Sequence, residues 1–289
     1  MRAVIALLAF LLLSGCNPRK TLPASDLFSS GKNLGPLDKR LQEASGLVAS
    51  INNPSYLWTL NDSGNPAEVF LIGDHAKIRL VCKLANVNNR DWEDIAIGAG
   101  PEPGKNYVYV ADIGDNSAQY DLKFIYRFPE PSLSNARELV IRQFDTLTLQ
   151  MPDGKRDAET LLIDPSTHDL FILSKRESAV HLYCARFPFD RGTIVLDKIS
   201  ELPFSLIVAG SISANGEEVL LKDYSRIYYW KKSGNERLQD ILTRKPIELP
   251  YDPEPQGEAI TWARDESGFY TVSESSHGQQ AQLKFYKRK

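Results

Sequence analysis

Two short stretches of this chain concentrate side chains that could bind a cation or move a proton. The first is Asp91-Trp92-Glu93-Asp94, and the second is Asp112-Ile113-Gly114-Asp115-Asn116. A strand signal lies between them, so acidic and amide groups stand at both ends of one strand unit. Such oxygens could bind a hard cation such as Ca²⁺, which takes about 6–8 oxygen ligands, or act as general acids and bases.

Glutamates begin several similar stretches of the chain. Each is followed by alternating apolar residues, by a turn rich in Gly, Pro, Asn or Asp, and by further strand signals. The repeated residues are Glu43, Glu93, Glu159 and Glu258. The interval between the last two contains a degenerate copy, Gly210–Gly216, in which Ser211 stands where an acidic residue would be expected.

The repeated stretches predict an all-β fold. Their short runs of Val, Ile, Tyr, Phe and Trp form five four-stranded units, which is typical of a β-propeller. The fifth unit ends after its third strand, and we expect a strand between Asp26 and Gln42 to close the ring. An outer strand is expected over Thr193–Ile199 and a short helical turn over Asn235–Thr243. A sixth blade hidden in a long interval, or a two-sheet sandwich, is the alternative.

A propeller would gather the acidic residues at one end of its channel. The first strand of each blade lines the channel and the second runs antiparallel to it, so the start of one and the end of the other share a mouth. The four repeated glutamates are therefore candidate metal ligands. The candidate ligand-binding residues are Asn61, Asp62, Asp94, Asp112, Asp115, Asn116, Lys175 and Arg176.

Several carboxylates at one mouth repel one another, by about 4 kcal/mol for two charges about 4 Å apart at an effective dielectric constant of about 20. Raised pKa values, ion pairs with Lys175 and Arg176, or bound Ca²⁺ could relieve this repulsion. With only four histidines in the chain, metals that prefer imidazole are disfavoured. A purely architectural use is equally open, because such carboxylates also bind backbone N–H groups and tie blades together.

The N-terminus carries a targeting signal. Met1-Arg2 precedes an apolar run, Ala3–Leu13, that is too short to span a bilayer comfortably. Leu13-Ser14-Gly15-Cys16 resembles a bacterial lipobox, which implies removal of residues 1–15 and attachment of acyl chains such as palmitate to Cys16. Residues 16–35 then form a tether, and residues 36–289 form a single propeller domain.

This resemblance implies a lipoprotein of the bacterial cell envelope that faces the periplasm or the exterior. Asn17 after the lipidated cysteine favours the outer membrane, again by resemblance. The net charge of −3 gives no reason to expect nucleic acid as a partner, and we expect a monomer that touches the membrane only through its lipid. Cys82 and Cys184 lie in apolar runs and are expected as buried free thiols, with a disulfide between them as the alternative.

The assembled motifs resemble a group of secreted bacterial β-propellers loosely allied to the phytase-like propellers. Leu57–Gly64, Tyr109–Asn116 and Asp157–Leu161 are among the matching stretches. The layout is also similar to that of calcium-activated nucleotidases, although the metal-binding signature of propeller phytases is not evident. The resemblance implies the fold and not a function, and from the acidic mouth we expect a module that binds a ligand or partner there, with or without Ca²⁺. A Ca²⁺-dependent hydrolase of phosphate esters or anhydrides and a structural envelope component are the alternatives.

Overall fold

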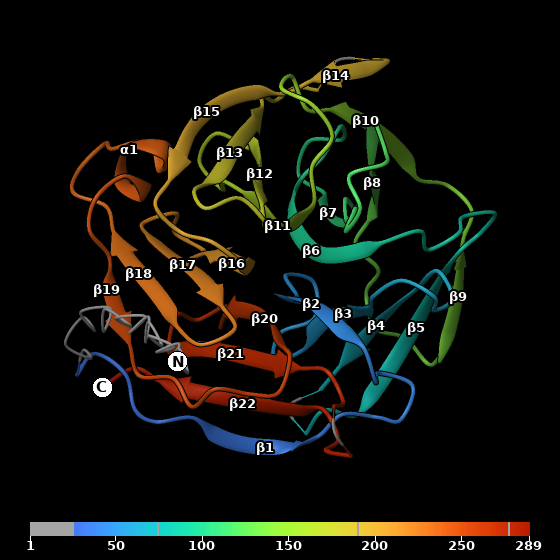
Figure 1. The fold of residues 1–289 in the computed structure, drawn as a ribbon. Helices are drawn as coiled ribbons and strands as arrows, with labels where there is room; N and C mark the ends of the chain where they lie inside the picture. Colours follow the sequence, from blue (N-terminus) through green and yellow to red (C-terminus); the bar gives the residue numbers. More distant parts are fainter. Residues whose placement is uncertain (1–25, 74, 190, 277) are drawn as a thin grey trace, which may run out of the picture.

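The computed structural model describes residues 26–289 except 74, 190 and 277, and folds them into a five-bladed β-propeller (Figure 1). Blade 1 contains β2 (Ala44–Ala49), β3 (Leu57–Asn61), β4 (Glu68–Ile72) and β5 (Ile78–Leu84). Blade 2 contains β6 (Trp92–Ala99), β7 (Asn106–Asp112), β8 (Leu122–Pro129) and β10 (Asp145–Gln150). Blade 3 contains β11 (Ala158–Ile163), β12 (Leu170–Ser174), β13 (Val180–Ala185) and β15 (Asp197–Leu202).

Blade 4 contains β16 (Ile207–Ile212), β17 (Glu218–Asp223), β18 (Ile227–Lys231) and β19 (Ile247–Leu249). Blade 5 contains β20 (Gly257–Trp262), β21 (Gly268–Ser273), β22 (Gln282–Lys287) and β1 (Lys32–Pro36). The first strands of the five blades, β2, β6, β11, β16 and β20, surround the central channel, and each contacts its two neighbours (Figure 1). The predicted propeller with five blades is therefore confirmed.

The ring is closed by the N-terminal segment, as the sequence predicts. β1 pairs antiparallel with β22, so the outer strand of blade 5 comes from the opposite end of the chain. Phe28 extends this closure: it is 1% exposed, and its ring lies 5.1 Å from that of Phe269 and 5.9 Å from that of Trp262. The propeller thus begins earlier than the expected boundary at residue 36, because the segment from Phe28 onward is packed and paired with blade 5.

The expected outer strand Thr193–Ile199 is wrong in its extent. It is two strands: β14 (Thr193–Val195) pairs parallel with β10 of blade 2, whereas β15 is the outer strand of blade 3. Leu196, which separates them, is 2% exposed, and its N–H donates to the Gln150 carbonyl. The chain therefore crosses between blades where a single apolar pattern predicts a continuous strand.

The connection between the third and fourth strands links neighbouring blades. In blade 2 this connection contains β9 (Glu138–Ile141), which pairs parallel with β5 of blade 1. In blade 3 it contains β14, which pairs parallel with β10 of blade 2. In blade 4 it contains the expected helical turn, α1 (Leu238–Leu242), which contacts β15 of blade 3. Each connection covers an outer strand that would otherwise be an open edge.

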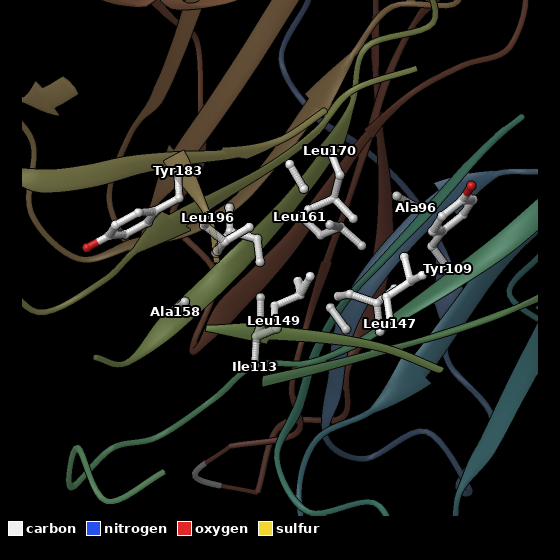
Figure 2. Close-up of a cluster of buried hydrophobic side chains, with 14 of the residues drawn as sticks. Ala96, Tyr109, Ile113, Leu147, Leu149, Ala158, Leu161, Leu170, Tyr183 and Leu196 are labelled. Atoms are coloured by element: carbon white, nitrogen blue, oxygen red, sulfur yellow. The ribbon is translucent and has the colours of Figure 1, made fainter. Parts of the chain in front are cut away.

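Most of the apolar core lies between adjacent blades. Figure 2 shows one cluster in which Ile113 and Leu149 of blade 2 approach Ala158 and Leu161 of blade 3. Cys82 and Cys184 are buried in two other clusters and are free thiols, as expected. Within the part of the chain that the structure describes, no helix has the length and apolar character needed to cross a membrane.

Candidate metal centre at the channel mouth

A β-bulge marks the start of every channel strand. In each blade the pairing of the first strand with the second skips one residue close to the channel mouth. The skipped residues are Ser45, Glu93, Glu159, Val208 and Glu258. An extra residue at a bulge is unpaired in the ladder and its side chain is re-aimed. Three of the five blades therefore carry a glutamate at this position.

The bulges correct the alignment of two blades. Glu43 lies two residues before the bulge residue of blade 1, and its carbonyl accepts the Asp62 N–H (2.8 Å), as the Asp91 and Asp157 carbonyls accept N–H groups in blades 2 and 3. Glu43 therefore corresponds to these aspartates and not to Glu93. In blade 4 the position aligned with Glu93 is Val208.

The residues two positions before the bulge also differ in polarity from blade to blade. Leu206 precedes Val208 in blade 4, so this blade is apolar at both positions, and Ser211 lies within β16. Blades 2 and 3, in contrast, have an aspartate followed two residues later by a glutamate. The acidic residues accordingly gather on one side of the mouth.

Five carboxylates form two overlapping groups. The first triplet is Asp62, Asp91 and Glu93, and the second triplet is Glu93, Asp157 and Glu159. In each triplet one oxygen per residue lies within 4.8 Å of the others, which is close enough for the three residues to hold one metal ion together. Glu93 belongs to both triplets. Of the four repeated glutamates, Glu93 and Glu159 lie in these groups, whereas Glu43 and Glu258 do not.

Glu93 is the most constrained member. It is 3% exposed, no lysine or arginine among the described residues pairs with its carboxylate, and its side-chain hydrogen-bond partner is the carboxyl group of Glu159. Burial, followed by the charges of Glu159 and Asp62, raises its pKa well above the ordinary value. Gly114 packs directly against this group: a Cβ there would overlap Glu93 Oε1 and the Asp91 carboxylate. The backbone thus approaches the carboxylates as closely as only glycine permits.

The second triplet carries its own counter-ions. Lys175 Nζ lies 2.5 Å from Glu159 Oε1, and Arg176 Nε lies 2.6 Å from Asp157 Oδ2. Asp157 also accepts the Asp115 N–H at 2.8 Å. Burial still raises the pKa of Glu159 to about 7, although Lys175 opposes the shift. The sequence candidates Lys175 and Arg176 are therefore counter-ions of this group.

The first triplet has no such partner. Among the described residues no lysine or arginine forms an ion pair with Asp62, Asp91 or Glu93. Burial is the largest cause that raises the pKa of Asp62, to about 6, and it also raises the pKa of Asp91. Arg90 and Lys123 lie nearby but pair with Asp112 and Asp115.

Glu258 completes the mouth from blade 5. It is 6% exposed and accepts a hydrogen bond from the Tyr224 hydroxyl at 2.8 Å. Burial, followed by the charge of Glu258, raises the pKa of Glu274 to about 9. Tyr224, from the apolar blade 4, thus connects the two sides of the mouth, a role that no repeat in the sequence indicates.

Several sequence candidates have structural roles instead. The carboxylate of Asp94 accepts the Ile95 N–H and the Leu161 N–H, both at 2.8 Å, and so ties β6 to β11. Asp112 pairs with Arg90 (3.1 Å). These contacts match the architectural alternative for these two residues.

The remaining candidates organise loops. Asp115 accepts the Gln119 and Tyr120 N–H groups at 2.7 and 2.8 Å and pairs with Lys123. The Asn61 amide donates to the Arg40 carbonyl at 2.6 Å. Asn116 lies exposed on the loop after β7.

Asp91 and Asp157 are not among the metal ligands predicted from the sequence, yet both belong to the triplets. The repeated Asp-x-Glu spacing of blades 2 and 3 was the available signal. Gly114 carried no signal, because its close approach to Glu93 depends on how the loop after β7 folds over the bulge.

The other end of the channel has a different character. A small cavity of about 70 Å³ opens there among mainly apolar residues of the channel strands, such as Leu47, Ile97 and Leu162. No acidic residue among those that the structure describes lines this cavity, in contrast to the mouth where the channel strands begin.

No protein-family model matches this chain, and no curated protein matches its sequence. Among solved structures, a chain in the crystal structure of a nidogen/laminin complex is similar, with 12% sequence identity and a TM-score of 0.43. The match covers 80% of this chain and 72% of that one.

Proposed function

We propose that this protein is a Ca²⁺-dependent binding module whose ion is held by the first triplet, Asp62, Asp91 and Glu93. The observation that carries the proposal is the state of Glu93, a buried carboxylate that lies among further carboxylates and that no lysine or arginine of the described residues pairs with. A buried charge needs a partner. The first triplet has three carboxylates and no ion pair with a lysine or arginine in the described part of the chain, so a divalent cation is the partner that fits.

The donor set favours Ca²⁺ over other metals. All the candidate ligands are carboxylate oxygens, which suit hard cations, and no cysteine or histidine belongs to either triplet. Three carboxylates supply fewer than the roughly 6–8 oxygens that Ca²⁺ takes. The remaining positions would hold water or oxygen atoms of a ligand at the channel mouth, which is how a bound ion would recruit a partner.

A hydrolase of phosphate esters or anhydrides is the second candidate. Burial raises the pKa of Glu159 to about 7, a value suited to a general base near neutral pH. A bound ion could polarise a phosphoryl oxygen. A screen of phosphate esters and nucleotides with Ca²⁺ tests this function. Turnover that Glu93→Gln abolishes without unfolding would support it, whereas no turnover on any substrate leaves the binding module.

We also propose that the protein is anchored to the cell envelope through acyl chains on Cys16, with the propeller outside the cytoplasm. Cys16 and the signal segment lie outside the described residues, so the lipobox resemblance alone supports this proposal. The test is cell fractionation of the Cys16→Ser chain. Membrane association that survives the substitution would contradict the anchor.

The Ca²⁺ site is tested by thermal melting of the Cys16→Ser chain. An ion that binds only the folded protein adds about 2.7 kcal/mol at a hundredfold excess over its Kd, which corresponds to a rise in Tm of roughly 5–10 °C for a chain of this size. Glu93→Gln should abolish the rise. Glu43→Gln, which removes an exposed carboxylate outside both triplets, should keep it. An unchanged Tm of the parent chain in millimolar Ca²⁺ would refute the site.

A further inference from the structure

One structural position of the mouth carries opposite charges in different blades. This position is the residue that directly follows the second strand of a blade. In three blades its N–H donates, at 2.8–3.1 Å, to the carbonyl of the residue that lies two positions before the bulge residue of the first strand. That residue is Asp62 in blade 1, Lys175 in blade 3 and Glu274 in blade 5. An ammonium group therefore stands in blade 3 where two other blades place a carboxylate.

The backbone of Lys175 is fixed on both sides. Its N–H donates to the Asp157 carbonyl (3.1 Å), and its own carbonyl accepts the Leu206 N–H (2.8 Å), which leads into blade 4. The side chain leaves this point toward the channel, so its origin cannot shift without breaking contacts in two blades.

The ammonium group is held as firmly as the backbone. The Lys175 side chain is 8% exposed, and its Nζ lies 2.5 Å from Glu159 Oε1. On its other side Nζ lies 5.4 Å from the centre of the Tyr224 ring, and the Tyr224 hydroxyl is fixed by its bond to Glu258. A cation over an aromatic face is attracted by the ring. The charge thus has a fixed place among the carboxylates.

The two triplets differ in charge as a result. The second triplet brings three carboxylates but also Lys175 and Arg176, whereas the first triplet brings three carboxylates and no ion pair from a described residue. Arg176 is 47% exposed at its side chain, so solvent screens it more than it screens Lys175.

We propose that the ammonium of Lys175 serves as a built-in second cation, which fills the second triplet and limits the mouth to one Ca²⁺. This inference rests on the proposed Ca²⁺ site in the first triplet. Because Glu93 belongs to both triplets, an ion that replaced the ammonium would share Glu93 with the first ion. Such a pair would resemble two-metal sites, in which the ions lie about 3.5–4 Å apart.

The test is the number of Ca²⁺ ions bound, measured by calorimetric titration and by metal analysis after dialysis. The parent chain and Lys175→Arg, which keeps the charge, should bind one ion. Lys175→Met and Lys175→Gln, which remove the charge, should bind two. The rise in Tm with Ca²⁺ should also be larger in Lys175→Gln than in the parent chain, because the ion would replace a lost internal partner.

Lys175→Met leaves Glu159 buried without a cation and could fail to fold without Ca²⁺. Lys175→Gln keeps a hydrogen-bond donor to Glu159, and both variants can be produced in Ca²⁺. One ion in the parent chain and one in Lys175→Gln would overturn the inference.

A parent chain that binds no Ca²⁺ would refute the proposed function instead. The same variants then still decide the role of Lys175: a site gained in Lys175→Gln supports it, and no gain overturns it.

Discussion

Glu93 has two ways to stay buried beside other carboxylates: it can hold a proton or share a cation. In the metal-free protein the pKa of Glu93 is raised, so the protonated carboxyl group is favoured over the carboxylate. A cation bound in the first triplet would displace this proton, so Ca²⁺ and H⁺ compete for the same oxygens. The same side chain therefore gives the site both its affinity for a cation and its dependence on pH.

The raised pKa values of the buried carboxyl groups predict how the stability of the metal-free protein depends on pH. The folded pKa of Glu274 is about 9 and that of Glu159 about 7, both above the ordinary glutamate value of 4.5. The folded state therefore binds more protons than the unfolded state above about pH 4.5, and its stability falls as pH rises. In chelator, the Tm should fall from pH 5 to 8, and Glu274→Gln should make the fall shallower.

Lys222 makes an opposing contribution to the pH dependence of stability, but mainly above pH 8. Burial lowers the pKa of Lys222 to about 8, so its contribution raises stability mainly above that pH. With Ca²⁺ present, the gain in Tm should be larger at pH 8 than at pH 5.5, because fewer protons compete. A Tm in chelator that rises between pH 5 and 8 would contradict the assignment of raised pKa values to this cluster.

At the scale of the strand, the bulge decides which residues reach the mouth. The sequence pattern starting at Glu43 matches the pattern at Glu93, yet the bulge residue of blade 1 is Ser45, whose hydroxyl donates to the Trp92 carbonyl (3.1 Å). The number of units and the closing strand were predictable, because alternation and turn residues are local signals. The bulge register and the strand crossing at Leu196 were not, because packing between blades determines them.

Substitution of Asp94 separates the effect of a strand-to-strand contact on stability from the effect of the metal site on Ca²⁺ binding. Asp94→Ala would leave the buried Ile95 and Leu161 N–H groups without their acceptor, at roughly 1–3 kcal/mol for each unsatisfied group. We expect a clear fall in Tm, while the increment in Tm that Ca²⁺ produces stays the same. Loss of that increment in a folded Asp94→Ala protein would place Asp94 in the site. Glu43→Ala, at an exposed position, is the control and should leave the Tm nearly unchanged.

At the scale of the whole molecule, the ring depends on the pairing of its two ends. Connections between the third and fourth strands link blades 1 to 4 along the chain, but blade 5 is completed only when β1 pairs with β22. The carboxylate cluster draws on blades 1, 2 and 3, and its electrostatic neighbours Glu258 and Glu274 belong to blade 5. We therefore expect the geometry of the mouth to depend on closure of the ring.

Substitution of Phe28 tests how much this closure contributes to stability. Its ring packs against Trp262 and Phe269, and the Arg288 guanidinium lies 5.0 Å from the ring centre. Phe28→Ala should cost about 3–5 kcal/mol, the usual range for removing a buried phenylalanine, and should lower the Tm by roughly 6–20 °C. Leu27→Ala is the matched control: its side chain is 40% exposed, and its backbone bond to Lys289 is unaffected by the substitution.

If closure shapes the mouth, Phe28→Ala should also weaken Ca²⁺ binding in the folded protein, although Phe28 contacts none of the carboxylates. Leu27→Ala should not. A Phe28→Ala protein with lower Tm but unchanged Ca²⁺ affinity would show that the mouth keeps its geometry when the closing contact is loosened. The links between blades 1, 2 and 3 would then be sufficient to hold the two triplets in place.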